Sequence, residues 1–178
     1  MGHPVATTGR IVLEEVRAAD EAELLASVAA SRALHHPWVD APDSAARFTM
    51  LVERATLPEH HTFLIRAADD GVLAGVVNVT NIVRGAFHSA FTGYYAFVAG
   101  AGRGLMTDGI SAAIDHSFDE LHLHRLEANI QPGNLRSIAL AERCGYRYEG
   151  CSPRYLFIDG AWRDHNRYAV TVEDRPVR

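Results

Sequence analysis

The amino-acid sequence predicts an α+β domain with a mixed sheet, and three features indicate this class. Segments of helical periodicity alternate with shorter apolar runs typical of strands. Three strand segments follow one another without a helix between them, and the third of these and the strand after it each run directly into a helix. The predicted order is β-α-α-β-β-β-α-β-α-β-β. No repeat, low-complexity stretch or linker divides residues 1–178, which suit a single domain.

The N-terminal half is predicted to contain a strand, two helices and a run of three strands. Asp20 is placed to cap the first helix, because a carboxylate can accept hydrogen bonds from the free amides of a first turn. That helix carries Leu24, Leu25 and Val28 on one face. The predicted elements are a strand at 10–17, a helix at 21–30, a loop at 34–40, a helix beginning near Ser44, and strands at 62–66, 73–79 and 90–98.

The C-terminal half is predicted to alternate helix and strand before closing on a strand pair. A long helix over residues 105–120 carries an apolar stripe that includes Met106, Ile110 and Phe118. Gly145 is placed to end a shorter helix, because glycine adopts the left-handed conformation that terminates helices. The remaining elements are expected at 125–130, 135–143, 146–158 and 162–172.

Composition excludes several classes of function. All 17 basic residues are arginine, so no lysine is present to serve a Walker-type phosphate loop, a Schiff base or an amine nucleophile. The net charge of −5 gives no general attraction to nucleic acid or anionic lipid. The sequence has no apolar run of membrane-spanning length and no recognisable signal peptide, so a cytoplasmic location is expected.

Cysteine and histidine give little support to a disulfide framework or a metal site. Cys144 and Cys151 form no C-x-x-C pair, and two reduced thiols are expected. His122 and His124 alternate along one strand face and could hold a metal, but no Cys or carboxylate lies at a supporting spacing. No metal is therefore expected.

A glycine-rich turn offers the first functional motif. The strand ending at Phe97 and Val98 runs through Gly102-Arg103-Gly104 into the helix that begins at Leu105. Glycines let backbone N–H groups converge, and a helix N-terminus adds partial positive charge, so the turn can hold an anion. Arg103 could add a full charge toward a phosphate. The same residues could instead form only a tight connection, and their spacing does not fit the dinucleotide-binding fingerprint.

A second polar helix start follows one strand later. Asn134 stands at a helix N-cap position, and Ser137 falls at the third helical position, facing the same end. Each residue also has a purely structural interpretation, as a cap and as a solvated first-turn serine. Both helix N-termini are nevertheless expected at one edge of a parallel strand pair, where ligands commonly bind.

These motifs resemble those of a known enzyme family. Gly102-Arg103-Gly104, Asn134-x-x-Ser137 and Arg143-Cys144-Gly145-Tyr146 are similar to the acetyl-CoA motifs of the GNAT N-acetyltransferases. Within that family, residues 81–88, His122-x-His124-Arg125 and the segment 155–165 (YLFIDGAWRDH) resemble RimJ-type enzymes, which acetylate the N-terminal alanine of a small-subunit ribosomal protein. The resemblance covers about residues 8–172 and implies a three-layer fold, with helices on both faces of a mixed, mostly antiparallel sheet.

The resemblance implies a binding site for acetyl-CoA, the cosubstrate. A backbone N–H near Ala96 or Phe97 would stabilise the oxyanion, Asn134 would orient the pantetheine, and Ser137 would protonate the leaving thiolate. Ala99 and Ala141 stand where many relatives carry a side-chain phosphate ligand and a tyrosine acid, respectively. The expected cofactor-binding residues are Phe97, Val98, Gly102, Arg103, Gly104, Leu105, Met106, Asn134 and Ser137.

The acceptor side is less well defined by sequence. Pro37 and Trp38 resemble the acceptor-side loop of RimJ-type enzymes, and His88 and Tyr95 complete the expected substrate-binding set. Candidate bases are Glu127, Asn129 and His88, although no general base is secured. Glu127 also has a simple interpretation as a solvated strand residue. An α-amine with pKa near 8 is about one-fifth neutral at physiological pH and needs little more than a proton sink.

Three functional hypotheses therefore stay open. The first is acetylation of a protein N-terminus, with no direct nucleic-acid or membrane contact expected and a homodimer possible. The second is acylation of a small amine such as an antibiotic, a dipeptide or a polyamine. The third is a CoA-binding module without turnover, which the absent side chains at Ala99 and Ala141 would allow.

Overall fold

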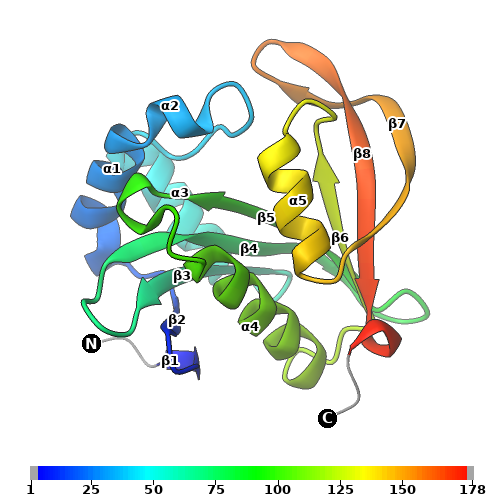
Figure 1. Cartoon of the computed structure of the whole chain (residues 1–178), viewed down its shortest axis with the longest axis horizontal. Coiled ribbons are helices and arrows are strands. Elements are labelled where there is room, and N and C mark those ends of the chain that lie inside the picture. The colour runs from blue at the N-terminus through cyan, green and yellow to red at the C-terminus, as the bar shows by residue number, and fades with distance from the viewer. Residues whose placement is uncertain (1–3, 176–178) are drawn as a thin grey trace.

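A twisted sheet of eight strands organises the chain, in the order β1-β2-β3-β4-β5-β6-β8-β7 (Figure 1). The computed structural model describes residues 4–175. The strands are β1 Pro4–Thr7, β2 Ile11–Glu15, β3 His60–Ala67, β4 Leu73–Val83, β5 Ser89–Ala96, β6 Arg125–Ile130, β7 Arg147–Ile158 and β8 Ala161–Thr171. The helices are α1 Glu21–Ala30, α2 Arg32–His35, α3 Ala45–Ala55, α4 Leu105–Asp119 and α5 Leu135–Arg143. Short 3₁₀ turns occupy Ala18–Asp20, Val98–Gly100 and Val172–Asp174.

Neighbouring strands are antiparallel except β5 and β6, which are joined through α4 and run parallel. Their pairing is brief, because it covers only Ser89–Phe91 against Arg125–Glu127. Beyond these residues β5 continues to Ala96 and β6 to Ile130 without pairing. The predicted mixed, mostly antiparallel α+β fold is confirmed, and the sheet opens at its one parallel junction.

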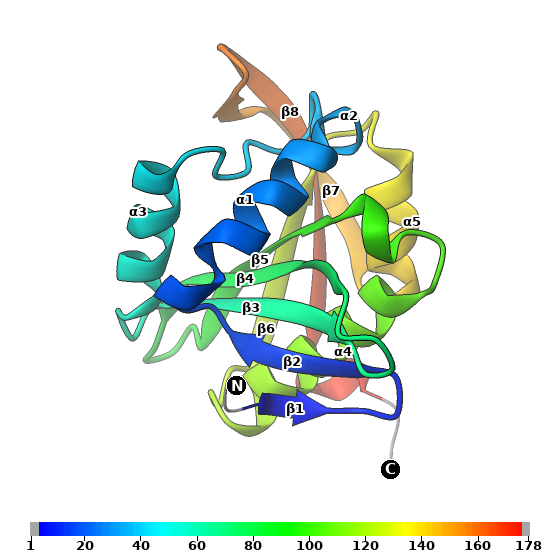
Figure 2. The ribbon, with the colours of Figure 1, turned by 90° about the vertical axis from the view of Figure 1, so that its left-hand side faces the viewer.

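Helices cover both faces of the sheet, giving three layers (Figure 2). Strand alternation divides the apolar side chains between two cores. Phe63, Ile65 and Val77 pack with α4 on one face, whereas Leu64 and Val76 pack with α1 and α3 on the other. Because β3 and β4 are buried on both faces, they appear in the sequence as nearly continuous apolar runs.

Close approach of α4 to the sheet depends on small residues. A Cβ added at Gly75 of β4 would lie 2.3 Å from Met106 Sδ and 2.7 Å from the Tyr95 carbonyl oxygen. A Cβ at Gly109 would lie 2.4 Å from Ile65 Cδ1. Absence of these side chains sets the depth of α4 and therefore the position of the glycine turn that precedes it.

Several local expectations need correction. β1 and α2 were not expected from the sequence, and α2 shortens the loop predicted at 34–40. Asp20 does not cap α1 through its side chain; its carboxylate accepts the Arg17 N–H at 2.8 Å and pairs with Arg66, because a 3₁₀ turn precedes the helix. β5 ends at Ala96, two residues earlier than predicted, where the chain enters the 3₁₀ turn. Within residues 4–175, no helix is both long and apolar enough to cross a membrane.

Candidate active site

A pocket of about 290 Å³ fills the opening between β5 and β6. It exists because the two strands diverge after Phe91 and Glu127, so side chains and backbone groups replace the missing ladder hydrogen bonds. The lining residues come from four parts of the chain: Trp38, Val39 and Asp40; Asn78, Thr92, Gly93, Tyr94 and Tyr95; Ala128, Asn129, Ile130, Gln131, Asn134 and Ser137; and Leu156, Ile158 and His165.

The pocket connects the two faces of the sheet. Tyr94 packs with the core beneath α4, whereas its neighbour Tyr95 packs with the core beneath α1 and α3. On β6, Ala128 and Ile130 belong to the α4 core, so the alternating Asn129 points to the opposite face. The opening therefore has an α5 wall, formed by residues such as Tyr94 and Ser137, and an open wall, formed by residues such as Tyr95 and Asn129.

On the α5 wall, the first turn of α5 is held in a fixed position. Asn134 is the N-cap, as predicted, and its Oδ1 accepts the Ser137 N–H at 3.2 Å. The Tyr94 hydroxyl donates to the Ser137 carbonyl oxygen at 2.9 Å. Burial raises the pKa of Tyr94, which keeps this phenol protonated as a donor. The backbone of Ser137 is thus fixed from two directions while its side chain lines the pocket.

The glycine turn leads directly into α4 through two residues of positive φ. Gly102 and Gly104 adopt φ values of 75° and 78°, which favour glycine, and α4 begins immediately afterwards at Leu105. The first amides of α4 have no preceding turn to bond to and are available to an anion.

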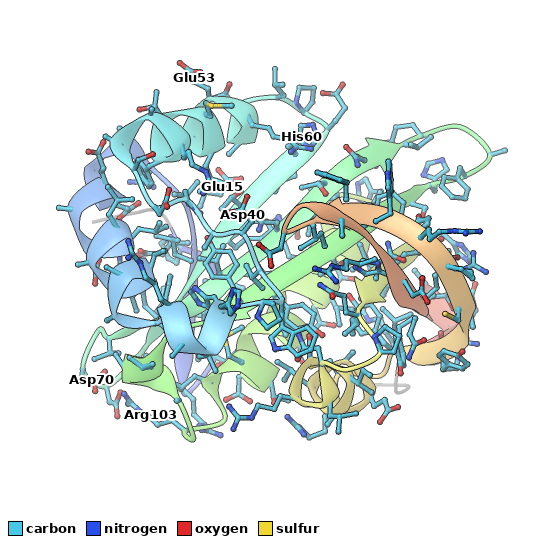
Figure 3. All side chains as sticks on the ribbon, turned by 90° about the horizontal axis from the view of Figure 1, so that it is seen from above. Glu15, Asp40, Glu53, His60, Asp70 and Arg103 are labelled. Atoms are coloured by element: carbon cyan, nitrogen blue, oxygen red, sulfur yellow. The ribbon has the colours of Figure 1, made fainter. Side chains whose placement is uncertain are left out.

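The arginine of this turn is directed elsewhere. Arg103 forms ion pairs with Asp69 at 2.8 Å and Asp70 at 2.9 Å in the turn between β3 and β4. Figure 3 shows Arg103 beside Asp70 at one edge of the molecule, away from Asp40 at the pocket. A second arginine, Arg10, donates to the Arg103 carbonyl oxygen and pairs with Asp108 at 3.3 Å. In this structure the turn presents backbone amides. The Arg103 guanidinium binds Asp69 and Asp70, and the Arg10 guanidinium binds the Arg103 carbonyl oxygen and Asp108.

Backbone groups at the end of β5 distinguish the two candidate oxyanion donors. The Phe97 N–H donates to the Ala74 carbonyl oxygen at 2.8 Å, so it is already engaged by β4. The Val98 N–H donates to Ser31 Oγ at 3.1 Å. Because amides alternate in direction along a strand, the Ala96 N–H points away from β4, toward the gap left by β6. The geometry favours Ala96 over Phe97.

Three buried polar atoms near the pocket have no hydrogen-bond partner among the described residues: Tyr95 Oη, Asn129 Oδ1 and Gln131 Nε2. Buried polar groups are nearly always paired, because an unpaired one costs about 1–3 kcal/mol. Tyr95 is only 7% exposed, and burial raises its pKa, so its hydroxyl is a neutral donor. These three atoms lie at one opening, where water or an entering ligand can supply their partners.

Other expected site residues lie at varying distances from this opening. Trp38 crosses to the β6–α5 loop, where its Cη2 lies 3.0 Å from the position of a Cβ added at Gly133. Glu127 pairs with Arg125 at 2.8 Å and does not line the pocket. His88 donates from Nδ1 to the His122 carbonyl oxygen at 3.2 Å, before the start of β5 and away from its open end.

The remaining expected residues are mainly structural here. Leu105 is buried, and Met106 packs against β4. Pro37 precedes Trp38 without lining the pocket, and Val98 is half exposed beside the glycine turn. Residues 4–175 contain no group of three or more His, Cys, Asp or Glu side chains placed to hold a metal. Three pocket residues have no role predicted from the sequence, Asn78, Gln131 and His165, although His165 stands in the segment 155–165 that carries the RimJ-type resemblance.

Comparison with known proteins agrees with this geometry. Residues 10–147 match the family model described as an acetyltransferase (GNAT) domain. The chain is 35% identical over 176 residues to the [ribosomal protein uS5]-alanine N-acetyltransferase of Escherichia coli strain K12, covering 94% of this chain and 91% of that one. It is 38% identical over 128 residues to the probable N-acetyltransferase YjcK of Bacillus subtilis strain 168, covering 72% and 71% of the two chains.

A solved structure extends this relationship to three dimensions. Mycobacterium smegmatis RimJ in complex with CoA-disulfide superposes with a TM-score of 0.85 at 30% identity, covering 98% of this chain and 92% of that one. The family model, the sequence identity to the E. coli enzyme and the superposition on RimJ all point to one family. The chain belongs to the GNAT family of acetyl-CoA-dependent N-acetyltransferases and is related to its RimJ members.

Proposed function

We propose that this protein transfers the acetyl group of acetyl-CoA to the N-terminal α-amine of a polypeptide, an alanine-initiated ribosomal protein. The observation that carries this proposal is the pocket that passes between β5 and β6 and joins the two faces of the sheet. A thioester can enter along the α5 wall while an amine approaches from the open wall. The named activity of the E. coli relative supports the choice of acceptor.

On the α5 wall, the turn at Gly102–Gly104 and the N-terminus of α4 would receive the pyrophosphate of acetyl-CoA. Asn134 keeps its side-chain N–H₂ for the pantetheine, because its oxygen is already bonded to the Ser137 amide. The Ala96 N–H would donate to the thioester oxygen as it gains negative charge, an interaction commonly worth about 3 kcal/mol.

The reaction needs a nitrogen lone pair at the start and a proton for sulfur at the end. The neutral amine attacks the thioester carbon, forming a C–N bond and a tetrahedral oxyanion. Collapse of that intermediate breaks the C–S bond. The Ser137 hydroxyl, on the α5 wall beside the expected path of the pantetheine, would protonate the thiolate directly or through water.

Thiol release from acetyl-CoA with an alanine-initiated ribosomal peptide tests this proposal, with a panel of small amines beside it. We expect release with the peptide, and a roughly 10- to 100-fold lower kcat in Ser137→Ala with little change in CoA affinity. Ser27→Ala is the matched control, because Ser27 lies on α1 outside the pocket.

Each alternative outcome identifies another function. Release only with small amines would place the protein among metabolite or drug acetyltransferases. CoA binding without release on any amine would favour a non-catalytic module. An unchanged kcat in Ser137→Ala would remove the serine from the leaving-group step.

A further inference from the structure

An imidazole on β8 lines the same pocket. His165 is only 2% exposed, yet it forms part of the wall that also contains Leu156 and Ile158. Of the carboxylates and imidazoles in residues 4–175, only Asp40 and His165 line this opening. Asp40 is a poor candidate for a buried base, because its side chain is 80% exposed and pairs with Arg47 at 2.9 Å.

The strand register places His165 on the acceptor side. Asn129 pairs with Arg167 and Ile130 pairs with Asn166 in the antiparallel β6–β8 ladder. Cross-strand partners share a face and successive residues alternate, so His165 projects to the same face as Arg167 and Asn129. This is the open wall, opposite Ser137. The imidazole therefore lies where an incoming amine would lose its proton, and the serine lies where a thiolate would gain one.

Hydrogen bonding defines which imidazole nitrogen is basic. His165 Nδ1 lies 3.0 Å from the Arg163 carbonyl oxygen. A carbonyl oxygen only accepts, so Nδ1 carries the hydrogen and Nε2 holds the lone pair. No hydrogen bond to Nε2 is found among the described residues. Burial lowers the pKa of His165 below its ordinary value of 6.5, so the ring is neutral at physiological pH.

The two carboxylates near His165 are engaged elsewhere: Asp164 accepts the Arg154 N–H at 2.7 Å, and Asp40 pairs with Arg47 at 2.9 Å. On β8, Asp164 is its charged neighbour and slightly opposes the lowering of its pKa, while the Arg163 guanidinium turns back to the Ile158 and Asp159 carbonyls. From β7, the Tyr155 ring lies 6.1 Å from the imidazole, centroid to centroid. Across the pocket stand Asp40 and the neutral phenol of Tyr95. Arg167, on the same face of β8, can only donate.

We propose that His165 accepts the proton released by the acceptor nitrogen when it attacks the thioester. The proposal rests on the acetyl transfer described above. As the C–N bond forms, the nitrogen becomes cationic and its N–H proton passes to Nε2 of His165. The intermediate then expels the thiolate, which takes a proton on the α5 wall, and the imidazolium returns its proton to water. Asn129 Oδ1, otherwise unpaired, accepts a second N–H of the same amine.

The dependence of kcat/KM on pH tests this role. In the wild type, both the amine and His165 must be neutral, so log kcat/KM is expected to rise with a slope of 2 below both pKa values. In His165→Asn and His165→Gln only the amine ionisation remains, and the slope falls to 1. At neutral pH we expect kcat/KM to drop roughly 100-fold. His165→Asn retains a donor for the Arg163 carbonyl, which makes it the more conservative variant.

Controls separate chemistry from folding. His116→Gln is the matched control, because His116 is another histidine whose pKa is lowered by burial, on α4 and outside the pocket, and this variant should keep the slope of 2. CoA affinity and the unfolding midpoint should be nearly unchanged in His165→Asn. If His165→Asn is destabilised, the pH slope of its residual activity still tests whether His165 is the base. In addition, exogenous imidazole should raise the rate of His165→Gly several-fold.

A slope of 2 retained in both His165 variants, or kcat/KM within about threefold of wild type, would overturn the proposal. If the wild type ignores the alanine-initiated peptide but acetylates a small amine, the same pH series is run with that amine. The proposal of a protein N-terminus as acceptor then fails, while the slope still tests the role of His165 as proton acceptor.

Discussion

The two walls of the active-site pocket differ in how their polar groups are satisfied. On the α5 wall, the Ser137 amide, the Ser137 carbonyl and the Asn134 oxygen all have protein partners. On the open wall, Tyr95 Oη, Asn129 Oδ1 and Gln131 Nε2 have none among the described residues. The backbone of the first wall is held by protein hydrogen bonds before any ligand arrives, whereas the second wall holds buried side-chain atoms without a protein partner among the described residues.

This difference matches what each wall is expected to bind. A rigid, preorganised surface favours binding of the cosubstrate, because ordering that surface during binding would reduce affinity. An acceptor amine brings its own hydrogen-bond donors. Unpaired buried atoms lower stability but discriminate strongly against ligands that cannot satisfy them. Four predictions test this contrast, from the largest expected effect to the smallest.

The largest effect is expected at the glycine turn. Gly104→Ala places a Cβ 3.2 Å from Arg10 Nη2 at a φ of 78°, at the residue that directly precedes α4. We expect the Kd for CoA to rise at least about 10-fold by calorimetry, with about 1 kcal/mol of stability lost. Gly85→Ala is the control, since Gly85 has a φ of 73° with nothing within 4 Å and lies outside the site. Equal CoA affinities in the two variants would contradict the assignment of the turn.

Two buried tyrosines provide a matched pair. Tyr95→Phe removes an unpaired hydroxyl from the open wall, so kcat/KM for the acceptor should fall about 10-fold while stability stays equal or rises slightly. Tyr146→Phe removes a hydroxyl that donates to Thr92 Oγ1 at 3.1 Å, so it should cost about 1 kcal/mol with less effect on turnover. Denaturant unfolding and steady-state kinetics measure both. The opposite pattern would show that the Tyr95 hydroxyl is structural.

Asn134 combines a structural and a binding role that two substitutions can separate. Asn134→Ala removes the N-cap acceptor and should cost about 1 kcal/mol of stability. Asn134→Asp keeps the acceptor but loses the side-chain N–H₂, so stability should be retained while CoA binding weakens. Retained CoA affinity in Asn134→Asp would limit this residue to capping.

The smallest effect is the dependence of stability on pH. Burial lowers the folded-state pKa values of His116 and His165 below 6.5. The unfolded chain therefore binds more protons than the native state below that pH, and stability is lost as pH falls through this range. His116 contacts the Phe63 ring, on the face away from the open wall. In His116→Gln the decline of the unfolding midpoint between pH 7 and pH 5 should be shallower than in wild type. An identical decline would show that His116 does not contribute to the pH dependence of stability.

The sequence predicts an element well where interactions between residues close along the chain determine its bounds. β6 and α5 were predicted with their observed bounds, and α4 to within one residue, because periodicity, capping and a helix-ending glycine act over a few residues. Asn134 caps α5 as expected for the same reason. β1 was missed because four residues on a sheet edge carry too little pattern. The role of Asp20 was mistaken because its partner Arg66 lies 46 residues away.

The sequence by itself determined the α+β class, the glycine turn and the family, since these depend on patterns within contiguous segments. Tertiary structure decided which residues meet. The divergence of β5 from β6, the binding of Arg103 by Asp69 and Asp70, and the pairing of Glu127 with Arg125 all depend on strand register and contacts between distant segments. The same register brings His165 of the last strand to the open wall. Burial and cross-strand neighbours set the chemistry of a side chain, and neither is encoded within a few residues of it.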